Sequence, residues 1–228
     1  YSSLHFNEET ISKIVEKYQA NLESIISHCT EQGKFGSVYT PSDYGLGSEI
    51  SFVELDSFLN EDFNGKARRE SVEGMYRLSG LQQGMLFHGL YNETGGAYTE
   101  QLSCDLTDPE LEIIRKSWSR VLKNHTILRS GFYYDVFSVP VQCVYREVEM
   151  PLTVLDYSNL EVEKRSEAIK DFESADRFKS FDFKAAPLMR IALIRKDENH
   201  FRMVWTSHYI LFDGWSLPIL LEEFLKTY

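Results

Sequence analysis

Residues 201–206, near the end of the chain, constrain the fold most, because this apolar segment has to be buried and runs directly into a turn. Its sequence, Phe-Arg-Met-Val-Trp-Thr, is rich in β-branched and aromatic residues and predicts a buried strand. Gly214 permits a tight turn that a residue with a Cβ would resist. Ser216 can then cap a helix whose apolar residues are Leu220, Leu221, Phe224 and Leu225.

The turn between this strand and this helix carries the candidate catalytic residues. His208 and Asp213 are five residues apart, where the chain passes from strand to helix. Turns held by a rigid scaffold commonly present catalytic groups into a cleft. The candidate catalytic residues are therefore His208, Tyr209, Asp213 and Gly214, with Trp215 directly after them.

Residues 208–214 resemble the His-His-x-x-x-Asp-Gly signature of the condensation domains of nonribosomal peptide synthetases. Chloramphenicol-acetyltransferase-like relatives share this signature in a shorter form. His208, Asp213 and Gly214 match it, whereas Tyr209 stands where the family has its second histidine, the one assigned to catalysis.

Three further segments resemble blocks of the same family, in the same order. Residues 76–88 resemble the first block, in the form associated with domains that follow an epimerization domain, and they include Ser79 and Gln82. Residues 124–132 resemble Arg-His-x-x-Leu-Arg-Thr-x-Phe, with Asn124 in place of the first arginine, and they supply Arg129. Residues 181–190 resemble Phe-Asp-Leu-x-x-x-Pro-Leu-x-Arg and supply Arg190. Four blocks in order make the resemblance specific.

The order of elements predicts an α+β fold, a mixed sheet with packed helices. Strands are expected at 98–106, 131–134, 141–148, 188–195 and 200–207, with a charged helix at 161–178. Asp108 is expected to cap a helix that starts at Pro109. Ser79 and Gln82 form a capping box for a helix with Leu81, Met85, Leu86 and Leu90 inward. The resemblance implies that residues 76–228 are the N-terminal lobe of the two-lobed chloramphenicol-acetyltransferase-like fold, without its second lobe.

The N-terminal part has a different character. Residues 7–29 predict a helix capped by Asn7, with a continuous apolar stripe that needs a packing partner. Ser51 and Glu54 predict a second, short helix through a capping box. By resemblance, residues 1–32 are the C-terminal tail helix of an upstream synthetase domain, and residues 33–75 are an interdomain linker. An N-terminal arm of the same domain is the alternative, and we expect the chain to be a fragment of a larger protein.

Charge and cysteine content exclude several classes of function. A net charge of −11 argues against binding to nucleic acid or to an anionic membrane. The three widely spaced cysteines, Cys29, Cys104 and Cys143, favour reduced thiols in a cytoplasmic protein over a disulfide framework or a zinc site. No signal peptide is visible, and no apolar run approaches the ~18 residues of a membrane span. No metal site is expected.

The resemblance implies peptide-bond formation in the synthesis of antibiotics and other secondary metabolites. A donor thioester and an acceptor amine would arrive on phosphopantetheine arms, delivered by peptidyl carrier domains; the chain itself would bind no cofactor. Adenylation and epimerization domains would be neighbours in the same polypeptide. The family's second histidine removes the amine proton or orients the amine. Because a phenol with a pKa of about 10 is a poor proton acceptor, Tyr209 predicts an impaired domain.

Each motif residue also has a structural interpretation. His208 is expected to be buried and hydrogen-bonded to the backbone, and Ser79 to be a helix cap. Asp213 is expected to pair with an arginine, Arg129 or Arg190, or one from the second lobe. Two other functions remain open: a catalytically inactive scaffold or recruiting module, which Tyr209 favours, and an epimerization domain, which Trp215 and the first block disfavour.

Overall fold

A computed structural model describes residues 1–34, 37–91, 96 and 98–228, which form two compact units, residues 1–40 and 41–228. The first unit is mainly one helix, α1 (Glu8–Gln32). The Asn7 side chain accepts a hydrogen bond from the backbone N–H of Thr10 at 2.8 Å, which confirms the predicted cap. Within this unit no residue of α1 is buried, so its apolar stripe has no packing partner there.

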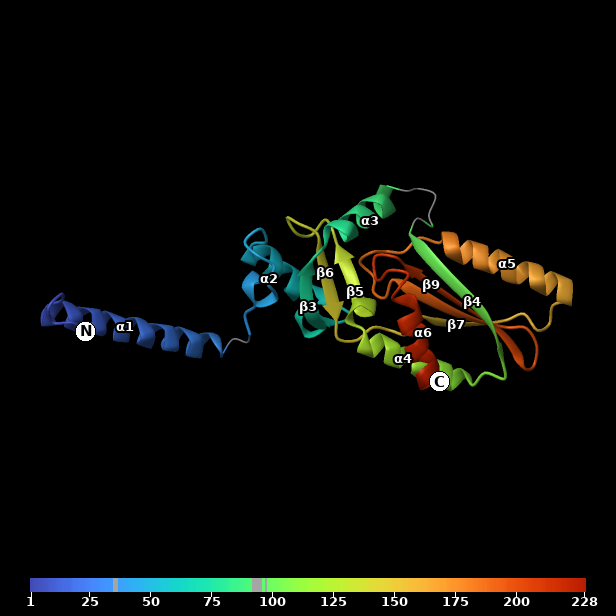
Figure 1. Ribbon diagram of the computed structural model, residues 1–228, viewed down its shortest axis with the longest axis horizontal. Helices are drawn as coiled ribbons and strands as arrows, with labels where there is room; N and C mark the ends of the chain where they lie inside the picture. Colours follow the sequence, from blue (N-terminus) through green and yellow to red (C-terminus); the bar gives the residue numbers. More distant parts are fainter. Residues whose placement is uncertain (35–36, 92–95, 97) are drawn as a thin grey trace. The chain divides into compact units, whose positions relative to one another are not determined.

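The second unit contains two main sheets, shown in Figure 1. The smaller sheet has the antiparallel order β3-β6-β5, formed by β3 (Val72–Arg77), β6 (Val141–Tyr145) and β5 (Ser130–Tyr133). The larger has the order β4-β9-β8-β7, formed by β4 (Thr99–Thr107), β9 (His200–His208), β8 (Met189–Arg195) and β7 (Leu152–Asp156). Only β7 and β8 are parallel among these pairs. The predicted mixed α+β architecture is confirmed.

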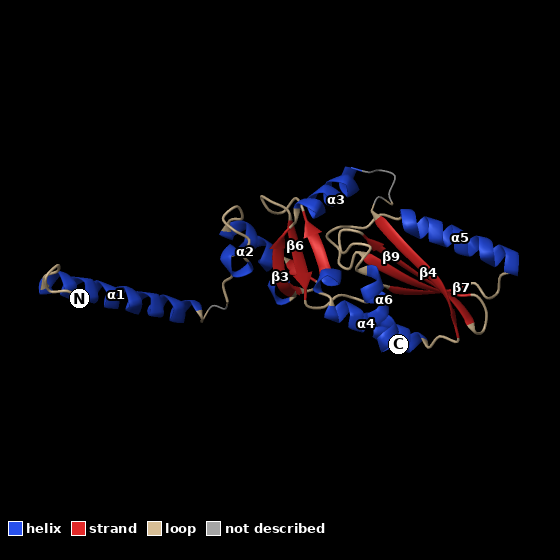
Figure 2. Ribbon diagram, viewed as in Figure 1, coloured by secondary structure: helices blue, strands red, loops and turns tan. Residues whose placement is uncertain are grey.

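Helices cover both faces of the larger sheet, as Figure 2 shows. The α4 helix (Leu111–Asn124) and the α6 helix (Leu217–Thr227) pack against residues of one face, including Trp205. The α5 helix (Val162–Phe178) covers the other face, where Val204 lies. The alternation along β9 produces this division, because neighbouring side chains of a strand point to opposite faces.

Residues 41–77 fold onto the smaller sheet. They form a 3₁₀ turn (Pro41–Tyr44), α2 (Phe52–Asn60), the short strands β1 (Asp62–Phe63) and β2 (Lys66–Ala67), a second 3₁₀ turn (Arg68–Glu70) and β3. Both bonds of the capping box between Ser51 and Glu54 are present. The guanidinium of Arg68 lies 4.1 Å from the ring centre of Phe58, which is fully buried. The range 33–75 therefore contributes to a core, and its assignment as a linker stays a prediction.

Two predictions, about a helix start and a helix face, are wrong. The α4 helix begins at Leu111 rather than at Pro109, and Asp108 has φ +49°, whereas an N-cap residue has an extended backbone. In α3 (Gly80–Tyr91), Met85 and Leu86 are buried, whereas Leu81 is 71% exposed and Leu90 is also exposed. In α6, Leu220 and Phe224 are buried, whereas Ile219 and Leu225 are exposed. No helix among the described residues is long and apolar enough to span a membrane.

The burial of Phe58 predicts that residues 41–70 unfold together with the sheet. We expect Phe58→Ala to lower the free energy of unfolding by about 3–5 kcal/mol, because it removes a ring packed on Tyr133 at 4.8 Å. Urea unfolding followed by circular dichroism measures this. Val53→Ala, at a position 71% exposed on the same helix, is the control and should change it by less than about 0.5 kcal/mol. Equal effects of the two variants would contradict the common core.

Candidate active site

His208 lies at the C-terminal end of strand β9, an inner strand of the larger sheet. His208 is its last residue and pairs with Thr99 of β4, and its N–H bonds to Leu188 O at 3.0 Å. Two residues later the chain is anchored again, because Ile210 and Leu211 are buried in the main core. The α6 helix starts at Leu217. The predicted strand–turn–helix unit is confirmed. The predicted need for glycine at 214 is wrong, because Gly214 has no positive φ and an added Cβ would lie 3.7 Å from the Tyr209 hydroxyl, an ordinary contact distance.

His208 is a buried residue that holds the turn. It is 3% exposed, and its Nδ1 accepts a hydrogen bond from the backbone N–H of Ile210 at 3.1 Å. Since Nδ1 uses its lone pair, the proton of the neutral ring is on Nε2. Burial lowers the pKa of His208 to about 4. The ring is therefore neutral near pH 7, in agreement with the structural role expected for it.

Two residues that sequence reasoning missed shape the surroundings of His208. The ring of Phe183 meets it edge-on, with 4.9 Å between ring centres. Gly89 of α3 lies against the same phenyl ring, and a Cβ at Gly89 would be 2.6 Å from Phe183 Cζ. Glycine at this position therefore lets α3 approach the site. The one sequence signal for this contact was that Phe183 belongs to the family block at residues 181–190.

The Tyr209 side chain spans the turn. It is half-buried, and its hydroxyl oxygen accepts a hydrogen bond from the backbone N–H of Gly214 at 3.1 Å. Its own backbone N–H bonds to Tyr98 O at 2.7 Å. The tyrosine thus links both ends of the turn. Its phenolic proton remains available for donation, but the ring offers no basic nitrogen.

Asp213 stabilises the start of α6 and forms no ion pair with either predicted arginine. Its Oδ1 accepts hydrogen bonds from the Ser216 N–H at 3.0 Å and the Ser216 hydroxyl at 2.8 Å. Ser216 is at the N-cap position, but its side chain makes no cap bond, so the predicted serine cap is wrong. Both arginines have other partners: Arg129 Nη1 lies 2.7 Å from Glu73, and Arg190 Nε lies 2.7 Å from Asp176. The predicted pairing with Arg129 or Arg190 is wrong because these nearer acids bind both guanidinium groups, and a pairing with an arginine of the second lobe stays a prediction.

The first block reaches the turn through Gln82. The backbone N–H of Ser79 donates to Gln82 Oε1 at 3.0 Å, and Ser79 Oγ accepts from the Gln82 N–H at 3.2 Å, which confirms this capping box. The Gln82 amide also donates to Gln142 at 3.3 Å and to Ile210 O at 3.5 Å. The structure therefore brings Gln82 to the turn, while Arg129 is buried under α4 and donates to Leu122 O at 3.0 Å.

Two further residues lie next to the turn, Trp215 directly after Gly214 and Glu223 on α6. The Trp215 side chain is 88% exposed. On α6, the Glu223 carboxylate lies 2.5 Å from both Asn124 Nδ2 and His125 Nε2 at the end of α4. This contact fixes α6 behind the turn. Sequence reasoning missed Glu223, which is about a hundred residues from its partners.

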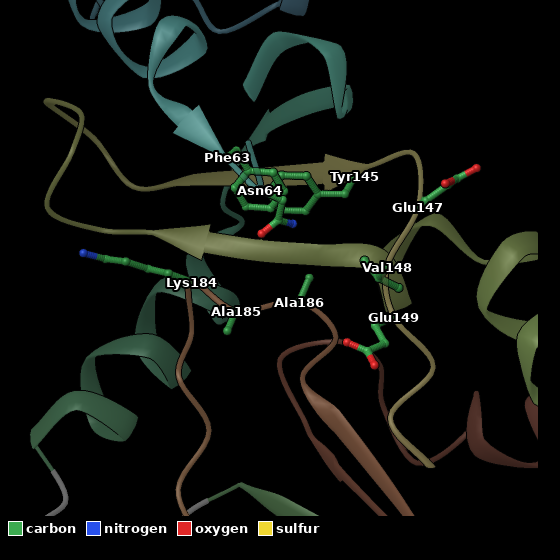
Figure 3. A pocket seen from close by; sticks show the side chains of 9 residues that line it. All are labelled: Phe63, Asn64, Tyr145, Glu147, Val148, Glu149, Lys184, Ala185 and Ala186. Carbon is green, nitrogen blue, oxygen red and sulfur yellow. The ribbon is translucent and has the colours of Figure 1, made fainter. Parts of the chain in front are cut away.

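The described residues contain no cluster of histidine, cysteine and acidic side chains that could hold a metal ion. A hollow of about 540 Å³ lies apart from the motif; Figure 3 shows its lining, which includes Tyr145, Glu147 and Lys184 but no residue of the turn. Lys184 is paired there with Asp135 at 2.7 Å. Neither feature adds a group to the candidate site.

The family model for the condensation domain matches residues 72–228. Among curated relatives, the chain is 36% identical over 228 residues to a linear gramicidin synthase of Brevibacillus parabrevis, and 34% identical over 224 residues to bacitracin synthase 1 of Bacillus licheniformis. These matches cover 100% and 98% of this chain, but only 4% of the length of each relative.

Solved structures share the fold. The cyclization-docking bidomain of the synthetase EpoB from Sorangium cellulosum gives a TM-score of 0.61 at 20% identity, over 68% of this chain and 30% of the other. The starter condensation domain of rhizomide synthetase RzmA gives 0.60 at 18% identity, over 68% and 39%. This chain spans less than half of each of those chains.

The buried neutral His208 predicts a pH dependence of stability. The unfolded chain takes up a proton at this residue near pH 6.5, and the folded chain only near pH 4, so stability falls as the pH drops through this window. We expect a loss of about 2 kcal/mol between pH 7 and pH 5 from this residue. Urea unfolding at both pH values, compared between the chain and its His208→Asn variant, measures it.

His28→Asn, on the exposed face of α1, is the matched control and should keep the full slope. An unchanged slope in His208→Asn would show that His208 is protonated as easily in the folded as in the unfolded chain.

Proposed function

The chain belongs to the condensation-domain family of nonribosomal peptide synthetases, and from this premise we propose that the complete domain forms an amide bond between two carrier-bound substrates. The amine of the acceptor attacks the donor's thioester carbonyl, so that a C–N bond forms and the C–S bond breaks. The amine proton leaves and the thiolate is protonated. The observation that carries the proposal is the turn at 208–214, which holds the motif between β9 and α6.

The partners follow from this reaction. Both substrates arrive on phosphopantetheine arms of peptidyl carrier domains, and this chain holds no cofactor of its own. We place adenylation and epimerization domains beside it in one cytoplasmic polypeptide. The matches to the synthetases support this, since they extend over residues 1–71, ahead of the family match. The exposed stripe of α1 supports its assignment as the tail helix of an upstream domain.

Tyr209 lowers the rate of the proposed reaction. In the family the second histidine of the motif acts on the amine, and a general base of this kind contributes ~10²–10⁴-fold. The Tyr209 ring has no basic nitrogen, and its hydroxyl oxygen already accepts the Gly214 N–H. It therefore cannot take the amine proton. The remaining source of rate enhancement is the alignment of the acceptor amine with the donor thioester, both bound to carrier domains.

The same contact favours a second candidate function, an inactive scaffold that binds carrier domains. In that case the bond between Tyr209 and Gly214 serves only to fix the turn. The exposed Trp215 would then be available for contact with a partner. The two candidate functions predict different results for the Tyr209→His variant: the enzyme should form amide bonds, and the scaffold should not.

The decisive measurement uses the domain extended through its second lobe, with loaded donor and acceptor carrier proteins. We expect Tyr209→His to raise the rate of carrier-bound dipeptide formation by ~10²–10⁴-fold, measured by intact mass, because it supplies a base. Tyr209→Phe, which removes only the hydroxyl, is the control and should stay as slow as the unmodified domain. Equal rates for Tyr209 and Tyr209→His would refute the assigned effect. Carrier binding without product in any variant would establish the scaffold.

A further inference from the structure

Two carboxylates, one helical turn apart on α5, attach this helix to the larger sheet. Glu173 Oε1 accepts a hydrogen bond from Arg202 Nε at 2.8 Å, and Asp176 Oδ1 accepts one from Arg190 Nε at 2.7 Å. Both carboxylates are largely buried, with 20% and 12% of their side chains exposed. Neither acid belongs to a motif that the sequence singled out, so each needs an explanation of its own.

Asp176 makes contacts to two strands. Its Oδ2 accepts a hydrogen bond from the hydroxyl of Thr206, which is fully buried on β9. Arg190 of β8 binds its Oδ1, and also donates from Nη2 to the backbone carbonyls of Asp176 at 2.6 Å and Lys179 at 3.0 Å. The arginine thereby binds two backbone carbonyls at the end of α5, one of which, Asp176 O, also accepts the Lys179 N–H at 3.2 Å. One carboxylate therefore joins the end of α5 to two neighbouring strands.

The strand register aligns these partners in a row. Thr206 lies opposite Arg190 of β8 and opposite Gln101 of β4. The Gln101 amide donates to Thr206 Oγ1 and to Glu173 O, both at 3.0 Å. We call Asp176, Arg190, Thr206 and Gln101 the Asp176 network. It ties three strands and one helix together at the end of the sheet where β9 stops.

The network is connected to the candidate site along two routes. Thr206 and His208 lie two residues apart on one strand, so their side chains point to the same face. The guanidinium of Arg190 lies 3.9 Å from the ring centre of Phe181. That ring meets His208 edge-on at 6.2 Å between centres. Both the backbone before His208 and one wall around its ring therefore depend on partners of Asp176.

We propose that Asp176 is a positioning residue of the active site, which holds His208 and the turn after it in place through Thr206, Arg190 and Phe181. Its effect on catalysis rests on the proposed function; its effect on His208 does not. A carboxylate suits this role because it can accept from the guanidinium and from the hydroxyl at the same time.

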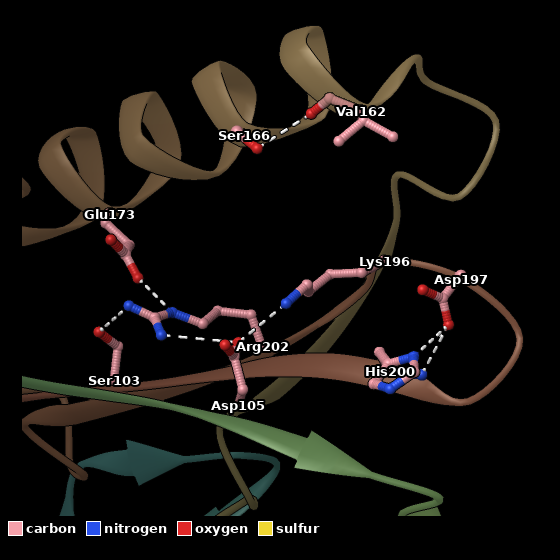
Figure 4. Close-up of polar contacts among 9 residues, drawn as sticks. All are labelled: Ser103, Asp105, Val162, Ser166, Glu173, Lys196, Asp197, His200 and Arg202. Carbon is pink, nitrogen blue, oxygen red and sulfur yellow. Dashed lines mark hydrogen bonds and ion pairs between the residues drawn. The ribbon is translucent and has the colours of Figure 1, made fainter.

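Glu173 provides a matched comparison, drawn in Figure 4. Arg202, its partner on β9, also donates to Ser103 Oγ at 2.8 Å and lies 3.6 Å from Asp105. We call these four residues the Glu173 network. It attaches the same helix to β9 with an ion pair, whereas the ion pair of Asp176 goes to Arg190 of β8. Arg202 is six residues before His208, or ~20 Å along a strand. The two networks therefore differ in their distance from the site.

The test uses the 228-residue chain labelled with ¹⁵N-histidine, in which ring-nitrogen NMR signals distinguish the two neutral tautomers of each of six histidines. His208→Asn assigns the His208 signals. We expect one tautomer, protonated on Nε2, in the chain and in Glu173→Ala. In Asp176→Ala and Thr206→Val we expect shifted or doubled His208 signals. Asp176→Asn can still accept a hydrogen bond from Arg190, so its His208 signals should change less than those of Asp176→Ala. This variant keeps the test possible if Asp176→Ala does not fold.

An unchanged His208 spectrum in Asp176→Asn and Thr206→Val would overturn the proposal, as would an equal change in Glu173→Ala. Activity is measured separately, in the two-lobe domain carrying Tyr209→His. There Asp176→Asn should lower kcat by up to ~10²-fold, as expected for a misplaced reacting group, with the KM for loaded carriers unchanged. An inactive Tyr209→His domain would reject the proposed function, while the NMR result would still decide the role of Asp176.

Discussion

The structure of the larger unit depends on the pairing of β9 along both of its edges. Nine residues of β9 pair with β4 on one side, and seven pair with β8 on the other. A strand bonded on both edges cannot shift its register without breaking both ladders. Its alternating side chains also separate the two helical layers, with Trp205 against α4 and α6 and Val204 against α5. The position of His208 is a consequence of this pairing.

The polar side chains of the turn after β9 are used mainly to hold the turn in shape. His208 uses Nδ1 for the backbone, Asp213 uses its carboxylate for Ser216, and Tyr209 uses its hydroxyl for Gly214. All three polar side chains of the motif thus serve the shape of the turn. Under the proposed function, the residue at the Tyr209 position acts on substrate, and a tyrosine there would keep the frame of the turn without supplying a base.

Local patterns predicted the elements that local forces determine. Four correctly predicted features depend only on neighbours within a few residues, and those neighbours can be read from the sequence. They are the Asn7 cap, the capping boxes at Ser51 and Ser79, and the strand that ends at His208. The partners of Arg129 and Arg190 were mispredicted, because a guanidinium binds whichever acid the fold brings nearest, and Glu73 and Asp176 carry no motif. Asp108 was mispredicted because its backbone is left-handed, with φ +49°, rather than extended as in an N-cap.

The pairing of β4 with β9 has a consequence for synthesis on the ribosome. Thr99 faces His208, so β4 leaves the ribosome roughly a hundred residues before its partner strand. At ~5–20 residues per second, the nascent chain exposes the unpaired edge of β4 for on the order of ten seconds. An open strand edge can pair with other chains during that time. The edge of β4 that binds β9 in the folded chain is therefore open to wrong partners until β9 has emerged.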